Sequence, residues 1–265
     1  MVNTGDMSVN PGNTSTLVYK YMRPEHLPHI WCPGCGNGII MRDVAQAIEN
    51  LGLSRNKTVI VSGIGCSSRA AGYLDFNTIH TTHGRAIAFA TGIKLANPEL
   101  EVIVLAGDGD ISAIGGNHLI HAARRNIGLT VVVFNNEIYG MTGGQMAPTS
   151  LPGQVTQTTP YGRDIKTAGY PVRVCEMLST LDGTAYAERV SVDCVKNINR
   201  AKKAIKKAFE TQIAGKGFSI VEVISACPTN WGLSPVDALG WLRENMLPYY
   251  PLGVYKDKTA EEEAK

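Results

Sequence analysis

The feature that most constrains the fold is an alternation of continuous apolar runs with helical patterns. The apolar runs, each ending in polar or glycine residues, occupy residues 57–65, 101–110, 129–140 and 218–225. The helical patterns occupy residues 84–98, 113–126, 200–210 and 234–246. Continuous apolar strands that alternate with helices are typical of a parallel sheet buried on both faces. We therefore predict an α/β fold, a parallel sheet with helices on both faces.

The chain shows no internal repeat and no low-complexity linker, and 265 residues are enough for one large domain with extensions. We predict an extended N-terminal arm at residues 1–28, a single domain at 29–255 and a solvated tail at 256–265. Residues 142–165 form a long stretch rich in Gly, Thr, Gln and Pro. A loop of this length in a compact domain is often functional.

Composition excludes several classes of protein. The net charge is +2, which gives no bulk electrostatic reason to bind nucleic acid. No apolar run approaches the roughly 20 residues that span a bilayer, and the polar N-terminus lacks the apolar core of a signal peptide. We expect a cytoplasmic protein that binds neither nucleic acid nor membrane. In that compartment the six cysteines are more typical of metal ligands, redox thiols or buried side chains than of disulfides.

An acidic turn and a pair of asparagines end two consecutive predicted strands. Asp108 lies in the sequence GDGD, and Asn135 and Asn136 follow one β–α–β unit later. The carboxyl ends of such strands lie side by side. A carboxylate, an amide oxygen and a backbone carbonyl form a hard oxygen set that suits Mg²⁺. Gly107 and Gly109 allow close backbone approach, and the following helix offers free N–H groups to a phosphate. The residues therefore predict a magnesium–diphosphate site.

Four cysteines occupy loop positions at this same predicted edge. Cys32 and Cys35 form a C-x2-C pair, whereas Cys66 and Cys227 each follow a strand. Zinc is one candidate, but four-cysteine zinc sites more often use two close pairs. One close pair, two distant ligands and Pro228 after the last cysteine suit a [4Fe–4S] cluster better. A thioredoxin-like dithiol is disfavoured, because glycines follow the pair and no clear helix begins inside it.

Six motifs in order carry a resemblance to a known family. They are WCPGCGNG, GIGCSSR, HTTHGRAIAFATGIKLA, GDGDISAIGGNH, NNEIYGMTGGQ and CPTNWG. Together they resemble the β subunit of a 2-oxoacid:ferredoxin oxidoreductase, from about residue 18 to residue 255. The resemblance implies a thiamine-diphosphate-binding fold with thiamine diphosphate, Mg²⁺ and one [4Fe–4S] cluster.

The GDG and NN motifs are similar to the thiamine-diphosphate fingerprint. That similarity implies that Asp108 and Asn136 bind Mg²⁺ through their side chains and Ile138 through its carbonyl. It also implies that Gly109 and Asp110 offer backbone N–H groups to the diphosphate.

The resemblance also assigns the cysteines. The matching cluster ligands are Cys32, Cys35, Cys66 and Cys227. Cys175 and Cys194 match no family ligand, and we interpret both as small buried apolar residues. In the implied reaction a thiamine enamine, left after CO2 departs from the 2-oxoacid, is oxidised by the adjacent cluster. The acyl group passes to coenzyme A and the electrons pass to ferredoxin.

The chain lacks a glutamate in a recognisable setting for activating the thiamine aminopyrimidine. In the resembled family that glutamate comes from the α subunit, which implies an obligate partner. We expect an α–β heterodimer or a dimer of such heterodimers, active only when both subunits are present.

Further candidates rest on single positions. His83 is a candidate catalytic residue that contacts the diphosphate or the substrate carboxylate, with a helix-capping or core role as the alternative. Gly65 and Asn37 join the predicted cofactor-binding residues. Arg69 and Arg85 are candidates for holding a carboxylate or a phosphate, or else form surface ion pairs.

Two departures from pyruvate-cleaving relatives bear on the substrate. Asn37 stands where those relatives tend to carry glutamate, and Met141 replaces an asparagine. Both favour 2-oxoglutarate over pyruvate, with a branched-chain or other 2-oxoacid as the alternative. Two other functions stay open: a flavin-linked or non-redox thiamine enzyme, and a zinc-stabilised, non-catalytic scaffold with a thiamine-enzyme fold.

Overall fold

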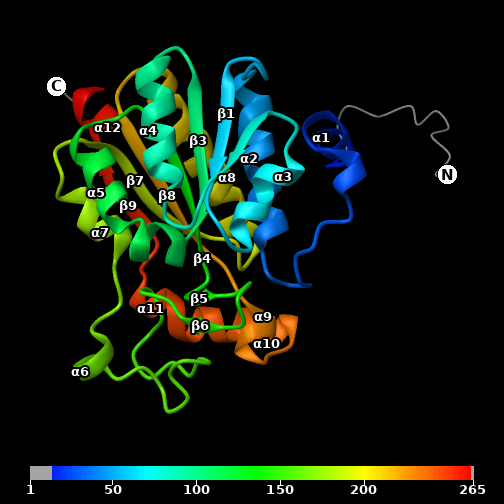
Figure 1. Ribbon diagram of the computed structural model, residues 1–265, viewed down its shortest axis with the longest axis vertical. Helices are drawn as coiled ribbons and strands as arrows, with labels where there is room; N and C mark the ends of the chain where they lie inside the picture. The colour runs from blue at the N-terminus through cyan, green and yellow to red at the C-terminus, as the bar shows by residue number, and fades with distance from the viewer. Residues whose placement is uncertain (1–13, 264–265) are drawn as a thin grey trace, which may run out of the picture.

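The computed structural model describes residues 14–263, which form a seven-stranded sheet in the order β2-β1-β3-β4-β8-β7-β9 (Figure 1). The strands are β1 (Thr58–Ser62), β2 (Asn77–His80), β3 (Glu101–Gly107), β4 (Thr130–Asn135), β7 (Thr184–Ser191), β8 (Phe218–Ile224) and β9 (Gly253–Asp257). All neighbours pair in parallel except β9, which pairs antiparallel with β7 at one edge. A separate short hairpin joins β5 (Ile138–Tyr139) and β6 (Gln145–Met146).

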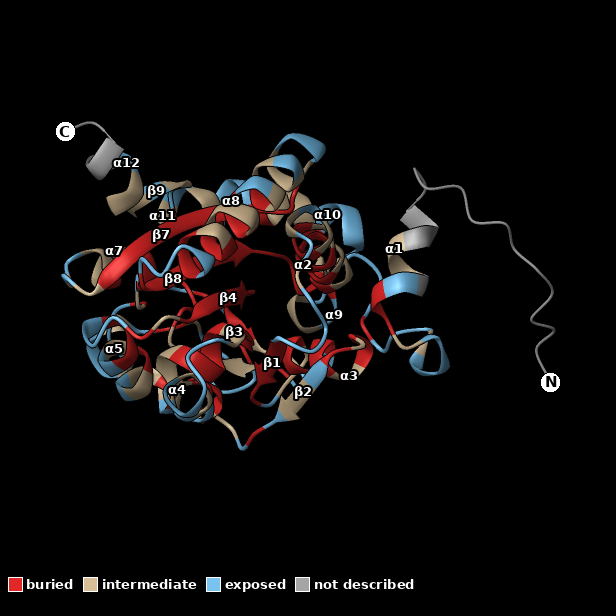
Figure 2. Ribbon diagram, turned by 90° about the horizontal axis from the view of Figure 1, so that it is seen from above, coloured by how far each residue is buried: buried red, intermediate tan, exposed pale blue. Residues whose placement is uncertain are grey.

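Helices cover both faces of the sheet (Figure 2). One face is covered by α1 (Thr14–Tyr21), α2 (Asn37–Leu51), α3 (Ala70–Tyr73) and α8 (Val195–Ile213). The other is covered by α4 (Ala86–Ala96), α5 (Gly116–Arg124) and α7 (Val174–Ser179). The predicted α/β architecture is therefore confirmed, with one antiparallel edge strand added.

The remaining helical segments are short. The α-helices are α6 (Ile165–Ala168), α9 (Pro228–Trp231), α10 (Pro235–Trp241), α11 (Leu247–Tyr249) and α12 (Lys258–Glu263). The 3-10 turns are Pro24–His26 and Ser67–Arg69, and the π turns are Asp110–Ile114 and Leu242–Met246.

The two cores follow from the alternation of side chains along each buried strand. On β3, Ile103 and Leu105 pack in the core beneath α2 and α8. Their neighbours Val102 and Val104 pack in the core beneath α4 and α5. Because successive side chains point to opposite faces, a strand buried on both sides needs apolar residues at every position. That requirement explains the continuous apolar runs of the sequence.

The carboxyl ends of β1, β3, β4 and β8 meet at one edge of the sheet, since these strands are neighbours and run parallel. Beyond this edge lie the β5–β6 hairpin and the helices α9, α10 and α11, in the lower part of Figure 1. The small core cluster of these helices includes Leu151 of the long loop, Leu242, Met246 and Tyr250. This layer encloses the loops that leave the sheet.

The described parts of the predicted arm and tail contain regular secondary structure. Residues 1–13 of the predicted extended arm and residues 264–265 of the predicted tail lie outside the described residues. The described part of the arm includes helix α1, and Tyr21 and Met22 are buried against the first core. The described part of the tail holds the end of β9 and helix α12. Within the described chain, no helix is long and apolar enough to cross a membrane.

Candidate active site

The loops that follow four neighbouring strands carry the chemically distinctive residues. Cys66 follows β1, Asp108 follows β3, Asn136 follows β4 and Cys227 follows β8. Because these strands are parallel and adjacent, their ends converge at the place where open α/β sheets bind ligands. The structure therefore brings together residues that lie far apart in the sequence.

A narrow cavity of about 40 Å³ lies among these loops. Its lining contains every residue predicted to contact thiamine diphosphate, magnesium or substrate: Asn37, Gly65, His83, Gly107, Asp108, Gly109, Asp110, Asn136 and Ile138. The Tyr139 ring lies so close to Gly109 that a Cβ there would be 2.4 Å from a ring carbon. The present volume suits a water molecule or a metal ion.

Asp108 has the properties of a buried cation ligand. Its side chain is buried, and the Thr149 hydroxyl donates a hydrogen bond to Oδ2. Burial raises the pKa of the Asp108 carboxyl to about 7, although the Thr149 hydrogen bond and nearby backbone N–H groups oppose that rise. A cation beside the carboxylate offsets this cost of burying charge. The donor set thus fits Mg²⁺.

The two adjacent asparagines differ in their partners. Asn135 Nδ2 donates to Glu222 Oε1 at 2.7 Å, and Asn135 Oδ1 accepts from the Glu137 backbone N–H at 3.1 Å. The buried Asn136 side chain lines the cavity and has no hydrogen-bond partner among residues 14–263. Of these two asparagines, it is therefore Asn136 that has a free amide oxygen for a metal ion.

His83 is held at the rim of the cavity by Asp110. Its Nδ1 lies 2.6 Å from Asp110 Oδ1, which also accepts the Gly84 backbone N–H at 2.6 Å. The carboxylate fills the space beside Gly63, where a Cβ would lie 1.9 Å from Oδ2. Gly84 has φ of +73°, and a Cβ there would collide with Ile114. This packing fixes the imidazole and leaves its Nε2 free of a protein partner within the described chain.

A second cavity, of about 230 Å³, is lined by Cys32, Cys35, Cys66 and Cys227 together. Gly140 lies between two of the sulfurs: a Cβ there would be 3.3 Å from Cys66 Sγ and 3.7 Å from Cys227 Sγ. A side chain at this position would therefore occupy the space that the sulfurs face. Cys175 is fully buried beside Glu222 and Arg189, and Cys194 precedes α8. Neither contributes to this cavity.

The four cysteines line one cavity but are not grouped around a single metal ion in the described chain. Over residues 14–263, no three His, Cys, Asp or Glu side chains lie close enough together to hold one metal ion. The cysteines nevertheless face one cavity of about 230 Å³. Burial, and to a smaller extent the neighbouring cysteines, together raise the pKa of the Cys66 thiol to about 11. A cation bound here would oppose that shift, because cations favour thiolates.

The two cavities share a wall. Asn37, Cys66, Asn136 and Gly140 line both of them. The Asn37 side-chain oxygen is buried in this wall without a hydrogen-bond partner. A group in the first cavity and a group in the second would therefore be separated only by this wall.

Comparison with known proteins gives a consistent result. Residues 63–223 match the family described as thiamine pyrophosphate enzyme, C-terminal TPP binding domain. The chain is 48% identical to the 2-oxoglutarate synthase subunit KorB of Archaeoglobus fulgidus, over 91% of this chain and 90% of that protein. It is 46% identical to the protein of the same name from Methanocaldococcus jannaschii, over 92% of this chain and 86% of that protein.

A solved structure is similar over most of its length. The 2-oxoglutarate:ferredoxin oxidoreductase from Magnetococcus marinus, with 2-oxoglutarate, coenzyme A and succinyl-CoA bound, is matched with a TM-score of 0.76 and 31% identity. The match covers 96% of this chain and 87% of that chain.

The chain belongs to the β-subunit family of the 2-oxoacid:ferredoxin oxidoreductases. The resemblance stated from the six motifs is thereby confirmed, as are the thiamine-enzyme fold and the assignment to an oxidoreductase.

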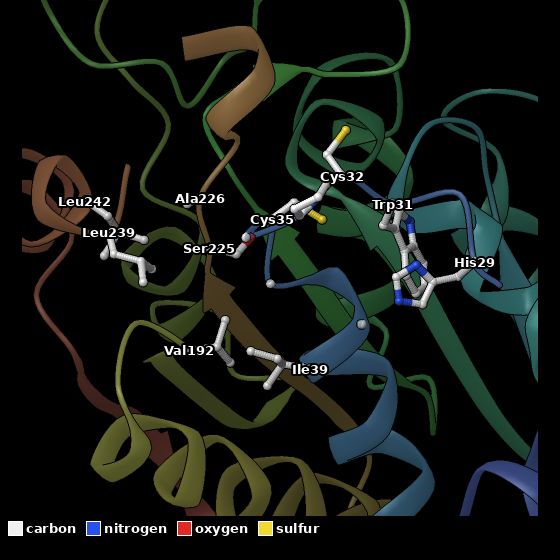
Figure 3. A pocket seen from close by; sticks show the side chains of 14 residues that line it. His29, Trp31, Cys32, Cys35, Ile39, Val192, Ser225, Ala226, Leu239 and Leu242 are labelled. Atoms are coloured by element: carbon white, nitrogen blue, oxygen red, sulfur yellow. The ribbon is translucent and has the colours of Figure 1, made fainter. Parts of the chain in front are cut away.

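A third cavity lies on the outer side of the cysteine-pair loop of this oxidoreductase subunit (Figure 3). Its volume is about 430 Å³, and its walls are largely apolar. Figure 3 shows Leu239 and Leu242 on one side, and Trp31 with His29 on the other. Because Cys32 and Cys35 also line this cavity, their loop separates it from the cysteine cavity.

Three polar residues close to the two cavities were not predicted from the sequence: Thr149, Asn230 and Glu137. Thr149 lies in the long loop, whose length was the one available signal. Asn230 follows Cys227 by three residues, a spacing that turns its side chain back towards the sulfur in a helical turn. Glu137 is buried with both carboxylate oxygens unpartnered and has φ of +59°. Burial raises the pKa of Glu137 well above its ordinary range.

Other polar candidates lie outside the first cavity. Arg69 lines neither cavity at the sheet edge. Arg85 donates to the Ile114 carbonyl at 3.3 Å and lies 3.2 Å from His118 Nε2. His80 Nδ1 lies 3.2 Å from the Ser62 hydroxyl. His80 and His118 are thus held by contacts away from the two cavities, and Arg85 contacts the turn that follows β3.

Proposed function

We propose that the chain is the β subunit of a 2-oxoglutarate:ferredoxin oxidoreductase. The reaction converts 2-oxoglutarate, coenzyme A and oxidised ferredoxin to succinyl-CoA, CO2 and reduced ferredoxin. The observation that carries the proposal is the shared wall of Asn37, Cys66, Asn136 and Gly140 between the thiamine cavity and the cysteine cavity. A thiamine enzyme without a redox step has no need of a four-cysteine cavity at that position.

The first cavity is assigned to Mg²⁺ and the diphosphate of thiamine. Asp108 and Asn136 supply side-chain oxygens for Mg²⁺, and Ile138 supplies its carbonyl. Gly109 and Asp110 supply backbone N–H groups at the start of a helical turn. Gly65 and Gly107 line the cavity without adding a side chain to it. When bound, thiamine diphosphate supplies the carbon nucleophile that cleaves the 2-oxoacid.

The second cavity is assigned to a [4Fe–4S] cluster that is held by Cys32, Cys35, Cys66 and Cys227. Such a cluster accepts electrons one at a time, which suits delivery to ferredoxin. The exposed Cys32 marks the side of the cluster nearest to solvent. Six unpaired cysteines also fit a reducing compartment, so we assign the protein to the cytoplasm.

His83 is assigned to the substrate end of the first cavity. Asp110 accepts a hydrogen bond from Nδ1–H of His83, which leaves Nε2 as the atom that faces a substrate or a phosphate oxygen. Tautomer and ring orientation are set together by this contact. We therefore propose His83 as a catalytic residue and Asp110 as the residue that positions it.

The partner is an α subunit that supplies the activating glutamate. Within the described chain no glutamate lines the thiamine cavity, although Asp108 and Asp110 do. The name of each KorB relative describes one subunit of a larger enzyme. We propose an α–β heterodimer, or a dimer of such heterodimers, that receives coenzyme A and docks ferredoxin.

The substrate assignment follows the named relatives. The KorB proteins carry 2-oxoglutarate in their names, and the similar solved structure contains 2-oxoglutarate. A second candidate is a branched-chain 2-oxoacid. The ketoisovalerate oxidoreductase subunit VorA of Methanothermobacter thermautotrophicus is 45% identical over 88% of this chain, although the match covers 49% of that protein.

Metal and sulfide analysis tests the proposal directly. The protein is purified without oxygen, assayed for iron, acid-labile sulfide and zinc, and examined by EPR after reduction with dithionite. We expect about four irons per chain and a reduced-cluster signal, as four cysteine ligands imply. One zinc and no iron would overturn the redox assignment and favour the scaffold. With the α subunit present, 2-oxoglutarate should reduce ferredoxin faster than 2-oxoisovalerate does, and the reverse order would select the branched-chain substrate.

A further inference from the structure

Asn230 lies in α9, and its side-chain amide turns back towards Cys227. Nδ2 donates one hydrogen bond to Cys227 Sγ at 3.2 Å and another to the Gly140 carbonyl at 3.1 Å. An amide nitrogen carries two hydrogens, so these two bonds use both. The Gly140 carbonyl can only accept, which requires that the nitrogen of the amide, and not its oxygen, face this side.

The neighbouring loop is shaped around this amide. A Cβ on Gly144 would lie 3.0 Å from Asn230 Oδ1, and a Cβ on Gly140 would lie 3.5 Å from Nδ2. Gly140 also lies beside the sulfurs of Cys66 and Cys227. Two glycines therefore leave room for one amide, and the amide keeps a fixed orientation towards the sulfur.

No other side chain within residues 14–263 donates a hydrogen bond to one of the four cavity sulfurs. Trp31, which also lines the cavity, donates its indole N–H to the Cys66 backbone carbonyl at 2.7 Å. Asn230 thus differs from Trp31, because its side chain contacts a sulfur atom as well as a backbone carbonyl. That sulfur belongs to a proposed cluster ligand.

We propose that Asn230 raises the reduction potential of the cluster, an inference that rests on the proposed function. One-electron reduction adds a negative charge that is shared by the cluster and its cysteine sulfurs. An N–H donor to a sulfur stabilises that added charge, so the reduced form is favoured. Asn230 thereby makes the cluster a better acceptor for electrons released by 2-oxoacid cleavage.

A purely structural role makes a different prediction. Through Gly140, Asn230 also ties α9 to the loop between β5 and β6. If this tie were its only role, Asn230→Leu and Asn230→Asp should alter the potential alike. The electrostatic role predicts an order. Leucine removes the donor at similar size, and aspartate places an acceptor oxygen against the sulfur. The potential should therefore fall from wild type to Asn230→Leu and fall further in Asn230→Asp.

The test is a redox titration of the enzyme with its α subunit, purified without oxygen and followed by the EPR signal of the reduced cluster. Iron and sulfide are measured on each sample. Thr229→Val is the matched control, because Thr229 lies in the same helix and lines the same cavity without bonding to a sulfur. We expect the control to retain the wild-type potential. An unchanged potential in Asn230→Leu with full iron content would overturn the role of Asn230.

If the Asn230 variants lose the cluster, a measurement on the wild-type enzyme still tests the proposal. Protein labelled with ¹⁵N in asparagine side-chain amides is reduced and examined by pulsed EPR. We expect a weak hyperfine coupling between the cluster and the amide nitrogen of Asn230. A cluster signal without this coupling would overturn the inference alone. Zinc in place of iron would overturn the proposed function as well, so the two failures are distinguishable.

Discussion

At the scale of single residues, the two adjacent asparagines at the end of β4 have different roles. Asn135 bonds to Glu222 on the neighbouring strand, whereas Asn136 lines the thiamine cavity without a protein partner. The sequence predicts that an asparagine pair at a strand end serves a site. The fingerprint selects Asn136, but it does not reveal the bond of Asn135. That bond depends on Glu222, which lies far along the chain.

Replacing Asp108 tests the magnesium assignment. We expect Asp108→Asn to lower the affinity for thiamine diphosphate more than about 100-fold, because the anionic magnesium ligand is lost. Thr149→Val removes the hydrogen bond to Asp108 Oδ2 and should cost roughly 10- to 100-fold, as outer partners of metal ligands do. Calorimetric titration with Mg²⁺ present measures both affinities. Iron content should stay at the wild-type level, and normal thiamine affinity in Asp108→Asn would refute the assignment.

Asp43 should make stability depend on pH. Burial raises the pKa of its carboxyl to about 6, and the Arg42 guanidinium opposes that rise. The folded state therefore holds this proton more tightly than the unfolded state does. Its contribution to stability is complete below about pH 4 and declines by up to about 3 kcal/mol as pH rises through 6. Asparagine does not titrate, so Asp43→Asn should gain stability over wild type as pH rises.

Thermal unfolding of the complex at several pH values measures this effect. The Tm of Asp43→Asn minus the Tm of wild type should increase from pH 4.5 to pH 8 by several degrees, since 1 kcal/mol shifts Tm by about 2–4 °C at this size. A Tm difference that stays flat over this range would show that Asp43 is ionised in the folded protein throughout.

At the scale of elements, the strands and helices predicted from the sequence were those with a continuous apolar run or a clear helical spacing of apolar residues. The strand β7 was not predicted, because Glu188 and Arg189 break its apolar run. The Arg189 side chain is fully buried and pairs with Glu222 on β8 at 2.8 Å and with Glu176 on α7. A buried charge pair across two strands cannot be identified from one strand alone. Helix α2 was also missed, since it begins among the glycines of the cysteine motif.

The buried ion pair gives a stability prediction. We expect Arg189→Met to destabilise the chain by about 3–5 kcal/mol, because Glu222 is left as a buried, unpaired charge. The double variant Arg189→Met with Glu222→Gln should recover much of this loss, since both charges are then absent. Glutamine can still accept the Asn135 hydrogen bond through its oxygen. Denaturation by urea compares the variants, and equal stability of the single and double variants would argue against the pairing.

At the scale of the whole molecule, the topology converts a linear pattern into a composite site. The parallel order β1-β3-β4-β8 places the loops from separate parts of the sequence along one edge. The alternation of strands and helices was sufficient to predict this edge and most of the residues on it. The predicted helix at residues 234–246 contains α10, but its packing with α9, α11 and the long loop in one layer was not predicted, because that packing depends on contacts with the long loop.

The absence of a glutamate from the described lining of the thiamine cavity gives a prediction for the assembled enzyme. The isolated chain should show only background reduction of a viologen dye by 2-oxoglutarate and coenzyme A. Addition of the α subunit should restore turnover, because that subunit supplies the activating group. Rate measurements on the chain alone and on the mixture test this directly. Full activity of the chain alone would place the activating group within this chain.

The position of Cys227 has a consequence for biosynthesis. Three of the cavity cysteines come from the first quarter of the chain, but the fourth follows β8, which inserts between β4 and β7. The ribosome, which adds about 5–20 residues per second, therefore makes Cys227 many seconds after Cys66. A cluster held by all four cysteines cannot be completed until β8 has joined the sheet. Iron loading would then act as a checkpoint, because only a chain with a finished sheet could retain its cluster.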